Sequence, residues 1–272
     1  MNIALEIESK LMTVLKKYER LAIAFSGGVD STLLAAAAAK ALGHDNILLV
    51  NIESPFGVQH DVDMVLEWAA ASDMPLHRLT IDPLTAEAIA ENSPERCYHC
   101  KKLLMGAICA AADGYGFEHV ADGFNVYDIS DYRPGARAAD ELGIVHPFLE
   151  AQMDKEQIRC LSRHYGLANW AAPADACLAS RIPYRTRITS KLLEKVRIAE
   201  AGLRKLGFKG CRVRCHDERA DIELQDEDFK KLPELRSQIA DAVAAAGFKK
   251  IFIDLRGYRR GTLNEGLDEA QK

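Results

Sequence analysis

Three cysteines in this chain have a spacing that can support chemistry. Cys97 and Cys100 form the only CxxC, in "PERCYHCKK", and Cys177 lies in "PADACLASR". Three thiolates need a fourth ligand, such as His99, to complete a structural zinc site. The same three thiolates can hold three irons of a [4Fe–4S] cluster and leave the fourth iron open to bind a labile sulfide. Taken alone, Cys177 would be a small buried residue.

A glycine loop, "AFSGGVDST" (24–32), is the second group of reactive residues. Gly27 and Gly28 let the backbone turn sharply and approach an anion, and the N–H groups that begin the next helix would point at that anion. Ser26 and Ser31 add hydroxyl donors, and Asp30 can hold Mg²⁺ between phosphates. The string is neither GxxxxGK[ST] nor GxGxxG. A lone Gly-Gly would more simply indicate a tight turn without a ligand.

The elements that must position these residues alternate along the first half of the chain. Short apolar runs at 21–25, 46–52 and 76–82 are separated by segments with helical spacing. This alternation predicts an α/β fold, a doubly wound parallel sheet that binds ligands at the carboxyl ends of its strands. After "LASRIPYRTRIT" (178–189) the order becomes helix, two strands, helix, strand. We therefore expect two domains, 1–182 and a smaller α+β domain, 183–272.

Composition limits the class of protein. The 272 residues are 48% hydrophobic with a formal net charge of −5. An acidic balance disfavours a dedicated nucleic-acid binder. No signal peptide or membrane span is recognisable, so we expect a cytoplasmic protein. Seven cysteines, an odd number, argue against a disulfide framework. In "GCRVRCH", strand alternation places Cys211 and Cys215 on one face, as core residues, and Arg212 and Arg214 on the other.

The loop string resembles the PP-loop, SGGxDS, of the ATP pyrophosphatase superfamily. That resemblance implies ATP and Mg²⁺ as cofactors, cleavage between the α and β phosphates, and adenylation of a substrate. The longer strings "ADGFNVYDISDYRPG", "ANWAAPADACLASRIPY" and "FIDLRGYRRGTLNE" resemble the LarE family, ATP-dependent sulfurtransferases of nickel-pincer cofactor biosynthesis. The resemblance runs nearly end to end.

The resemblance implies a small-molecule nucleotide substrate, pyridinium-3,5-biscarboxylic acid mononucleotide, and a source of sulfide or another sulfur donor. One branch of the family has a single cysteine, at the position of Cys177, and gives up that residue's sulfur. Because this chain also has Cys97 and Cys100, it resembles the branch that holds a [4Fe–4S] cluster on all three. The resemblance also implies a homo-oligomer without membrane or nucleic-acid partners.

The resemblance assigns site residues in three groups. The catalytic residues would be Cys177 and Asp30. Nucleotide contacts are expected from Ser26, Gly27, Gly28, Asp30, Ser31, Ser54, Asp122, Gly123 and Asn125. Substrate contacts are expected from Arg181, Arg212, Arg214, Arg259, Glu200 and Glu223. Arg133 would neutralise charge in the cleft. On spacing alone, Arg212 and Arg214 would be solvated surface residues.

Two other functions are compatible with the loop. A tRNA thiolase shares the PP-loop and can use three cysteines, but the acidic balance and the absence of an appended RNA-binding domain argue against it. A non-catalytic ATP-sensing module would need the loop and no cysteine trio.

Overall fold

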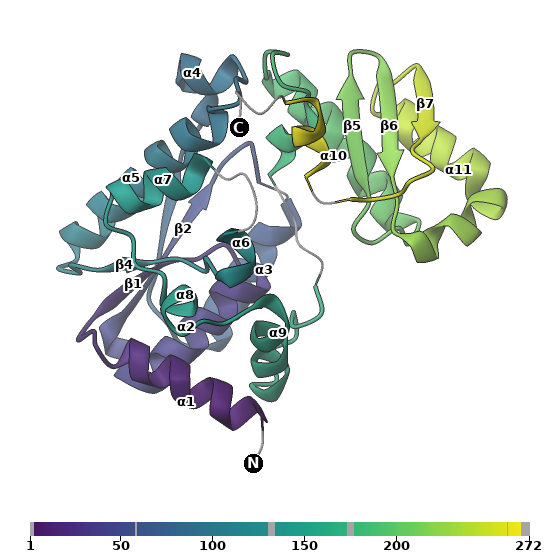
Figure 1. The fold of residues 1–272 in the computed structure, drawn as a ribbon. Helices are drawn as coiled ribbons and strands as arrows, with labels where there is room; N and C mark the ends of the chain where they lie inside the picture. Colours follow the sequence, from purple (N-terminus) through teal and green to yellow (C-terminus); the bar gives the residue numbers. More distant parts are fainter. Residues whose placement is uncertain (1–2, 58, 130–133, 173–176, 260, 268–272) are drawn as a thin grey trace. The chain divides into compact units, whose positions relative to one another are not determined.

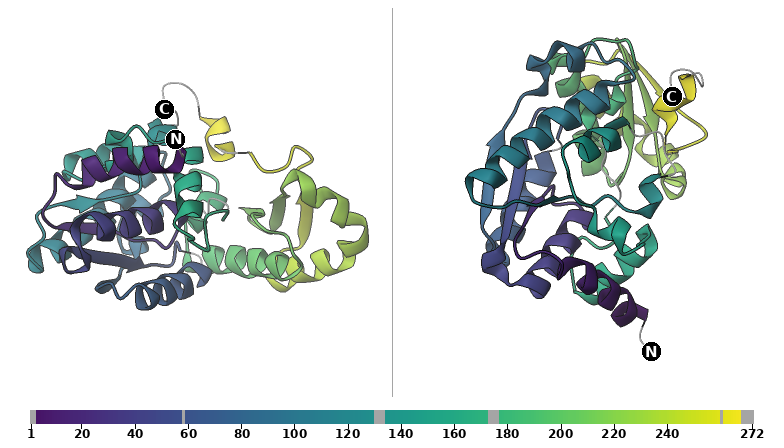
Figure 2. Two further views of the ribbon diagram at one scale, coloured as in Figure 1. Left: turned by 90° about the horizontal axis from the view of Figure 1, so that it is seen from below. Right: turned by 60° about the vertical axis from the view of Figure 1, so that its left-hand side comes forward.

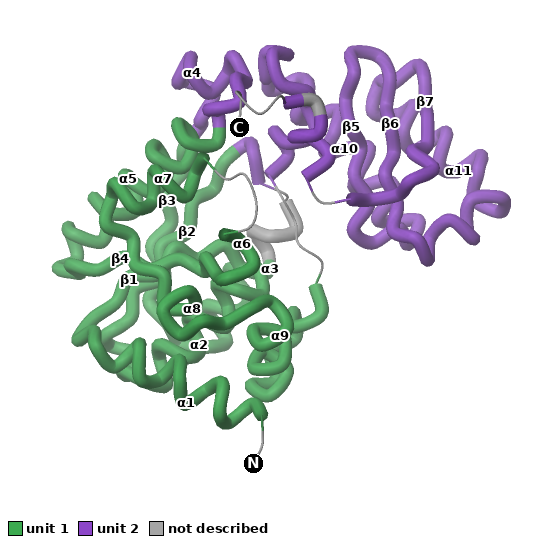
Figure 3. The backbone as a smooth tube through the Cα atoms, in the orientation of Figure 1, with its two compact units in different colours: residues 1–54, 59–81, 97–172 green, residues 55–58, 82–96, 173–272 purple. Residues whose placement is uncertain are grey.

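The computed structural model describes residues 3–57, 59–129, 134–172, 177–259 and 261–267, so Arg133 lies outside the described residues. The chain packs into two compact units (Figure 3). Unit 1 comprises residues 1–54, 59–81 and 97–172, and unit 2 comprises residues 55–58, 82–96 and 173–272. Unit 2 thus includes two short segments from the first half of the chain, whereas the sequence predicted one boundary after residue 182.

Unit 1 contains the predicted parallel sheet. Its strands are β1 (Leu21–Ala24), β2 (Ile47–Glu53), β3 (Leu76–Thr80) and β4 (Val120–Ala121). They lie in the order β3-β2-β1-β4, and every pairing is parallel (Figure 1). The chain builds outward from β1 to β3 and then returns to β4 on the other side of β1. Ligands of such sheets bind where the strand order reverses, at the carboxyl ends of β1 and β4.

Helices cover both faces of this sheet because its strands are apolar on both sides. Leu21 and Ile23 share one buried cluster with α1 (Ile3–Leu15), α2 (Val29–Leu42), α3 (Gln59–Ala71) and α9 (Lys155–His164). Ala22 belongs to a second cluster with α5 (Arg96–Gly114) and α7 (Pro134–Glu141). Two further views of the ribbon are shown in Figure 2. Two short helices, α6 (Val126–Ile129) and α8 (Pro147–Glu150), complete the unit. The predicted doubly wound α/β architecture is confirmed.

Unit 2 has the predicted α+β order. The helix α10 (Ser190–Lys205) precedes β5 (Arg212–His216) and β6 (Arg219–Glu223), which pair antiparallel. After α11 (Leu232–Ala245), β7 (Lys250–Ile253) joins β6 in parallel. Cys211 and Cys215 are buried, which confirms their core face. The short α4 (Glu87–Ala90) also belongs to this unit. No helix in the described part of the chain is long and apolar enough to cross a membrane.

Candidate nucleotide loop, cysteines and arginine-lined cavity

The glycine loop connects β1 to α2 with backbone donors available for an anion. Gly27 has φ 78°, a conformation that favours glycine. Gly28 is the N-cap of α2, and no described side chain caps the helix at that position. The hydroxyls of Ser26 and Ser31 lie 3.1 Å apart, and the Ser31 hydroxyl donates to the Gly28 carbonyl at 3.2 Å. Uncapped N–H groups at a helix start, together with the helix dipole, make an anion site.

Lys155 is bound to the carboxylate expected to hold magnesium. Its ammonium nitrogen lies 2.6 Å from both Oδ1 and Oδ2 of Asp30. A capping box between Asp154 and Gln157 fixes the start of α9, and Lys155 is the first residue of that helix. Sequence reasoning missed Lys155. The string "DKEQ" predicts a helix start, but it carries no sign of a partner 125 residues away.

The end of β4 lies against the loop. A Cβ atom added at Gly123 would fall 2.7 Å from Cβ of Asp30, so only glycine fits there without a shift. The neighbouring Asp122 is buried and binds two groups that the sequence did not reveal. Lys101 lies 2.8 Å from its Oδ2, and His146 Nδ1 lies 2.7 Å from its Oδ1. The structure thus brings Asp122 and Gly123 to the glycine loop, at the reversal of strand order.

Charges and hydrogen bonds around Asp122 and His146 shift the pKa of each group in the direction opposite to the effect of burial. Burial alone would raise the pKa of Asp122, but the Lys101 ammonium and the His146 hydrogen bond outweigh it and hold that pKa well below its ordinary value. Burial alone would lower the pKa of His146, but its hydrogen bond to Asp122 raises it. Asp122 is therefore an anion neutralised within the protein, which limits its repulsion of a phosphate nearby.

Asn125 and Ser54, the other expected nucleotide contacts, lie near the carboxyl ends of β4 and β2. Asn125 is buried, and its Oδ1 accepts the backbone N–H of Tyr127 at 3.1 Å, so its side chain shapes the turn after β4. Ser54 follows the last residue of β2, at the edge of the sheet where the glycine loop also lies. Both stay candidates for a nucleotide contact.

The three candidate cluster ligands belong to both units. Cys97 and Cys100 are half-buried on the first turns of α5 in unit 1, and a spacing of three residues places them on one helix face. Cys177 is exposed in unit 2, so it is not the buried residue expected when it is taken alone. The described residues contain no group of three His, Cys, Asp or Glu side chains arranged to hold a metal. The cluster stays a prediction.

A buried ion pair holds the residues that follow Cys177. Arg181 and Glu200 have fully buried side chains, with Nε of Arg181 2.8 Å from Oε1 of Glu200. Nη1 of Arg181 donates to the Cys177 carbonyl at 3.1 Å, and the Ser180 hydroxyl donates to the same carbonyl at 2.8 Å. Glu200 also accepts the backbone N–H of Val213 at 3.0 Å. These contacts favour a positioning role for Arg181 and Glu200 over direct contact with substrate.

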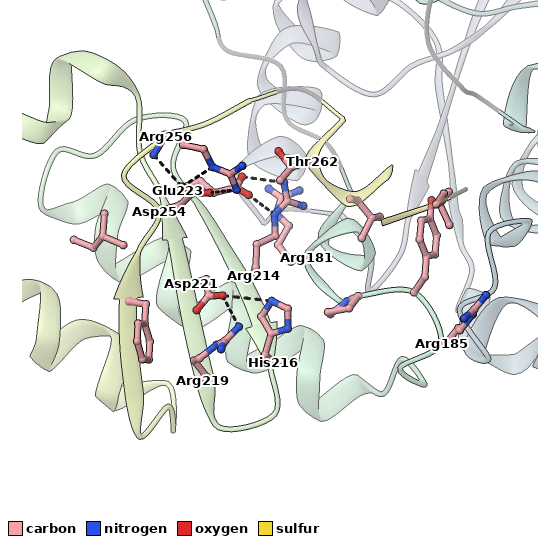
Figure 4. Close-up of a pocket in the computed structure, with 16 residues that line it drawn as sticks. Arg181, Arg185, Arg214, His216, Arg219, Asp221, Glu223, Asp254, Arg256 and Thr262 are labelled. Atoms are coloured by element: carbon pink, nitrogen blue, oxygen red, sulfur yellow. Dashed lines mark hydrogen bonds and ion pairs between the residues drawn. The ribbon is translucent and has the colours of Figure 1, made fainter. Parts of the chain in front are cut away.

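Unit 2 has a cavity of about 580 Å³ (Figure 4). Five arginines line it: Arg181, Arg185, Arg214, Arg219 and Arg256. Its acidic lining residues are Asp221, Glu223 and Asp254. Arg214 forms a fork with the buried Glu223, at 2.9 Å for both N–O pairs, and donates to the Ser180 carbonyl at 2.7 Å. The cationic excess makes this cavity suited to a phosphate or carboxylate ligand.

Three predicted substrate residues lie outside this cavity lining: Arg212, Arg259 and Glu200. Arg212 is buried, donates to the Cys211 carbonyl at 3.0 Å, and lies with its guanidinium carbon 5.2 Å from the ring centroid of Tyr258. Arg259 is paired with Glu265. Of the predicted substrate residues, the structure therefore brings Arg181, Arg214 and Glu223 to the cavity.

Some known proteins match only part of this chain, and others match nearly all of it. The NAD synthase family matches residues 4–112. The pyridinium-3,5-bisthiocarboxylic acid mononucleotide synthase of Lactiplantibacillus plantarum is 33% identical over 97% of this chain and 96% of its own length. An uncharacterized protein of Synechocystis is 35% identical over 96% of this chain and 99% of its own length. A glutamine-dependent NAD⁺ synthetase of Synechocystis is 33% identical over 25% of this chain and 12% of its own length.

Proposed function

Because the chain belongs to the LarE family of sulfurtransferases, we propose that it activates a carboxylate of pyridinium-3,5-biscarboxylic acid mononucleotide with ATP and exchanges one oxygen for sulfur. A substrate carboxylate oxygen attacks the α phosphorus of ATP and pyrophosphate leaves. Sulfide then attacks the acyl adenylate carbon and AMP leaves, which gives a thiocarboxylate. A second round at the other carboxylate would give the bisthiocarboxylate.

The nucleotide loop is suited to the first step. Its uncapped helix start, the Ser26 and Ser31 hydroxyls and the Gly123 cradle form a site for the departing pyrophosphate. Asp30 would hold Mg²⁺, whose positive charge offsets the charge that develops on the leaving group. With Asp30 holding Mg²⁺, the Lys155 ammonium would be free to bind a phosphate oxygen.

The cavity of unit 2 is suited to the mononucleotide. Its arginines can bind the substrate phosphate, and the fork between Arg214 and Glu223 holds the Arg214 guanidinium in a fixed orientation. Arg181 and Ser180 fix the backbone of Cys177 through hydrogen bonds to its carbonyl. Arg181 therefore positions the candidate sulfur-handling residue while it also lines the cavity.

Cys97, Cys100 and Cys177 are the residues that would hold a [4Fe–4S] cluster. The donor set fits the cluster in type, since two thiols share one helix face and the third is exposed. When bound, such a cluster supplies sulfide at an iron that has no protein ligand. Subsequent transfers would draw on a sulfur donor.

The observation that carries this proposal is the arginine-lined cavity in the same unit as the exposed Cys177, in a chain with an intact glycine loop. The test is anaerobic incubation of the purified chain with Mg²⁺–ATP, sulfide and the biscarboxylate mononucleotide. We expect substrate-dependent release of pyrophosphate and AMP, and a thiocarboxylate product by mass spectrometry. Pyrophosphate release that requires bulk tRNA instead of the mononucleotide would contradict the proposal.

A further inference from the structure

Two asparagines, one on β2 and one in the segment after α9, hold the glycine loop (residues 24–32). Nδ2 of Asn51, on β2, donates to the Phe25 carbonyl at 2.8 Å. Nδ2 of Asn169, which follows α9, donates to the Gly27 carbonyl at 2.9 Å and also lies 3.0 Å from the Thr32 hydroxyl. All of these residues belong to unit 1. The two amides therefore fix carbonyl groups on both sides of Ser26.

Fixing carbonyls matters in a loop that binds an anion. A carbonyl oxygen turned toward a phosphate repels it, whereas an N–H group turned toward it binds it. The Gly27 carbonyl accepts a second bond from the Thr32 hydroxyl at 3.2 Å, and the Gly28 carbonyl accepts the Thr32 N–H at 3.0 Å. With these carbonyls engaged inside the protein, the loop conformation is fixed, and the N–H groups that begin α2 stay without a side-chain cap.

The amide oxygen atoms of the same two side chains bear on whether these residues serve packing or the positioning of the loop. Oδ1 of Asn51 and Oδ1 of Asn169 are buried, and neither has a hydrogen-bond partner among the described residues. A buried acceptor without a donor costs stability. The orientation of each amide is nonetheless fixed, because only its nitrogen can donate to a loop carbonyl. Packing alone does not explain these asparagines, whereas positioning of the loop does.

We propose that Asn169, together with Asn51, positions the glycine loop to bind pyrophosphate, the part of ATP that leaves. This inference rests on the ATP step of the proposed function. Both are positioning residues, since each acts through loop carbonyls and has no assigned contact with the nucleotide. Their effect is specific to the phosphates that the loop binds. AMP, which lacks the β and γ phosphates, depends on them much less.

The experiment measures binding of Mg²⁺–pyrophosphate and of AMP to the full chain by calorimetry. We expect Asn169→Ala to weaken pyrophosphate binding roughly tenfold and to change AMP binding less than about twofold. Asn169→Asp keeps the shape but replaces the donor with an anion facing the Gly27 carbonyl. It should weaken pyrophosphate binding more than alanine does, whereas a role in packing alone predicts the reverse order.

Asn46→Ala is the matched control. Nδ2 of Asn46 also donates to a backbone carbonyl, that of Leu42, at 2.9 Å, but it lies outside the loop. This variant should bind both ligands as the wild type does. Unchanged pyrophosphate binding by Asn169→Ala, or an equal loss of AMP binding, would overturn the inference alone. Wild-type protein that binds neither ligand would overturn the proposed function as well.

Discussion

Lys155 donates to both carboxylate oxygens of Asp30, at 2.6 Å each, across 125 residues of sequence. The ammonium group thus neutralises the carboxylate at the position where a metal ion would bind. When Mg²⁺–ATP binds, Mg²⁺ would replace the Lys155 ammonium at Asp30. Lys155 would then be able to contact the phosphates. This exchange predicts different roles for the two residues.

We expect Asp30→Ala to abolish substrate-dependent pyrophosphate release, because the Mg²⁺ position is lost. Lys155→Met should retain Mg²⁺ binding but release pyrophosphate more slowly, since one positive charge near the leaving group is missing. Titration with Mg²⁺ at saturating ATP separates the two variants. If Asp30→Ala releases pyrophosphate at the wild-type rate, Asp30 has no part in the mechanism.

Gly123→Ala should disturb the same carboxylate by steric contact. The added Cβ would lie 2.7 Å from Cβ of Asp30, and relief of such overpacking typically costs about 1–3 kcal/mol. We expect a lower free energy of unfolding and a higher KM for Mg²⁺–ATP. Gly106→Ala is the control, because its added Cβ meets nothing within 4 Å on α5. An ATP KM equal to that of the wild type in Gly123→Ala would show that Asp30 tolerates the shift.

The sequence predicted the local parts of this site better than its long-range contacts. Apolar runs and helical spacing revealed the strands, and the glycine loop predicted an anion site, because each signal lies within a few neighbouring residues. Lys155, Lys101 and His146 carry no such signal, since their partners come from distant segments that meet only in the folded sheet.

Periodicity also misassigned the side chain of Arg212. Strand alternation placed Arg212 beside Arg214, but only Arg214 lines the cavity. The guanidinium of Arg212 instead donates to backbone carbonyls. Alternation fixes the face from which a side chain leaves the strand, and a long side chain can still turn to another partner.

The pair of His146 and Asp122 predicts a pH-dependent stability. The pKa of His146 is raised in the folded state, so the pair stabilises the fold fully below about pH 6.5, the ordinary value. That contribution is lost as the pH rises through the folded pKa, and Lys101 and Asp140 also act on this histidine. We expect His146→Gln to lose less thermal stability than the wild type between about pH 6 and pH 9.

His44→Gln is the control for this measurement, because His44 is exposed on a short helical turn and does not belong to the group of His146, Asp122 and Lys101. It should follow the wild-type pH profile. The lowered pKa of Asp122 acts in a different window, since its contribution is present above about pH 3.9 and is lost only in strong acid. Equal pH profiles for wild type and His146→Gln would mean that His146 stays neutral in the fold.

Arg214→Lys tests the cavity as the substrate site. Lysine keeps the charge but cannot form the fork with Glu223 or present two parallel donors to a phosphate. We expect substrate affinity to fall roughly tenfold, from one lost charge-assisted hydrogen bond, while ATP affinity stays unchanged. Arg187→Lys is the matched control, since Arg187 pairs with Glu87 at an exposed site outside the cavity lining. A fall in ATP affinity with substrate affinity intact would refute the assignment.

The final prediction concerns whether Cys177 keeps its sulfur. We expect Cys97, Cys100 and Cys177 jointly to bind one [4Fe–4S] cluster, so that Cys177 acts as a ligand and remains intact. A ligand can take part in repeated transfers, whereas a cysteine that gives up its sulfur allows one transfer per chain. The measurement is the intact mass of the protein after turnover and removal of the cluster, combined with the amount of sulfur transferred.

An unchanged chain mass with more than one sulfur transferred per chain is the expected result. Iron and sulfide content should fall in Cys97→Ala, Cys100→Ala and Cys177→Ala alike, because each thiolate holds one iron. Cys160→Ser is the control, since Cys160 is an exposed thiol on α9 and should be dispensable. Loss of one H₂S from the chain, mapped to dehydroalanine at residue 177, would instead identify Cys177 as the sulfur donor. In that case Cys97 and Cys100 would need a different explanation, because a sacrificed Cys177 requires no partner thiols.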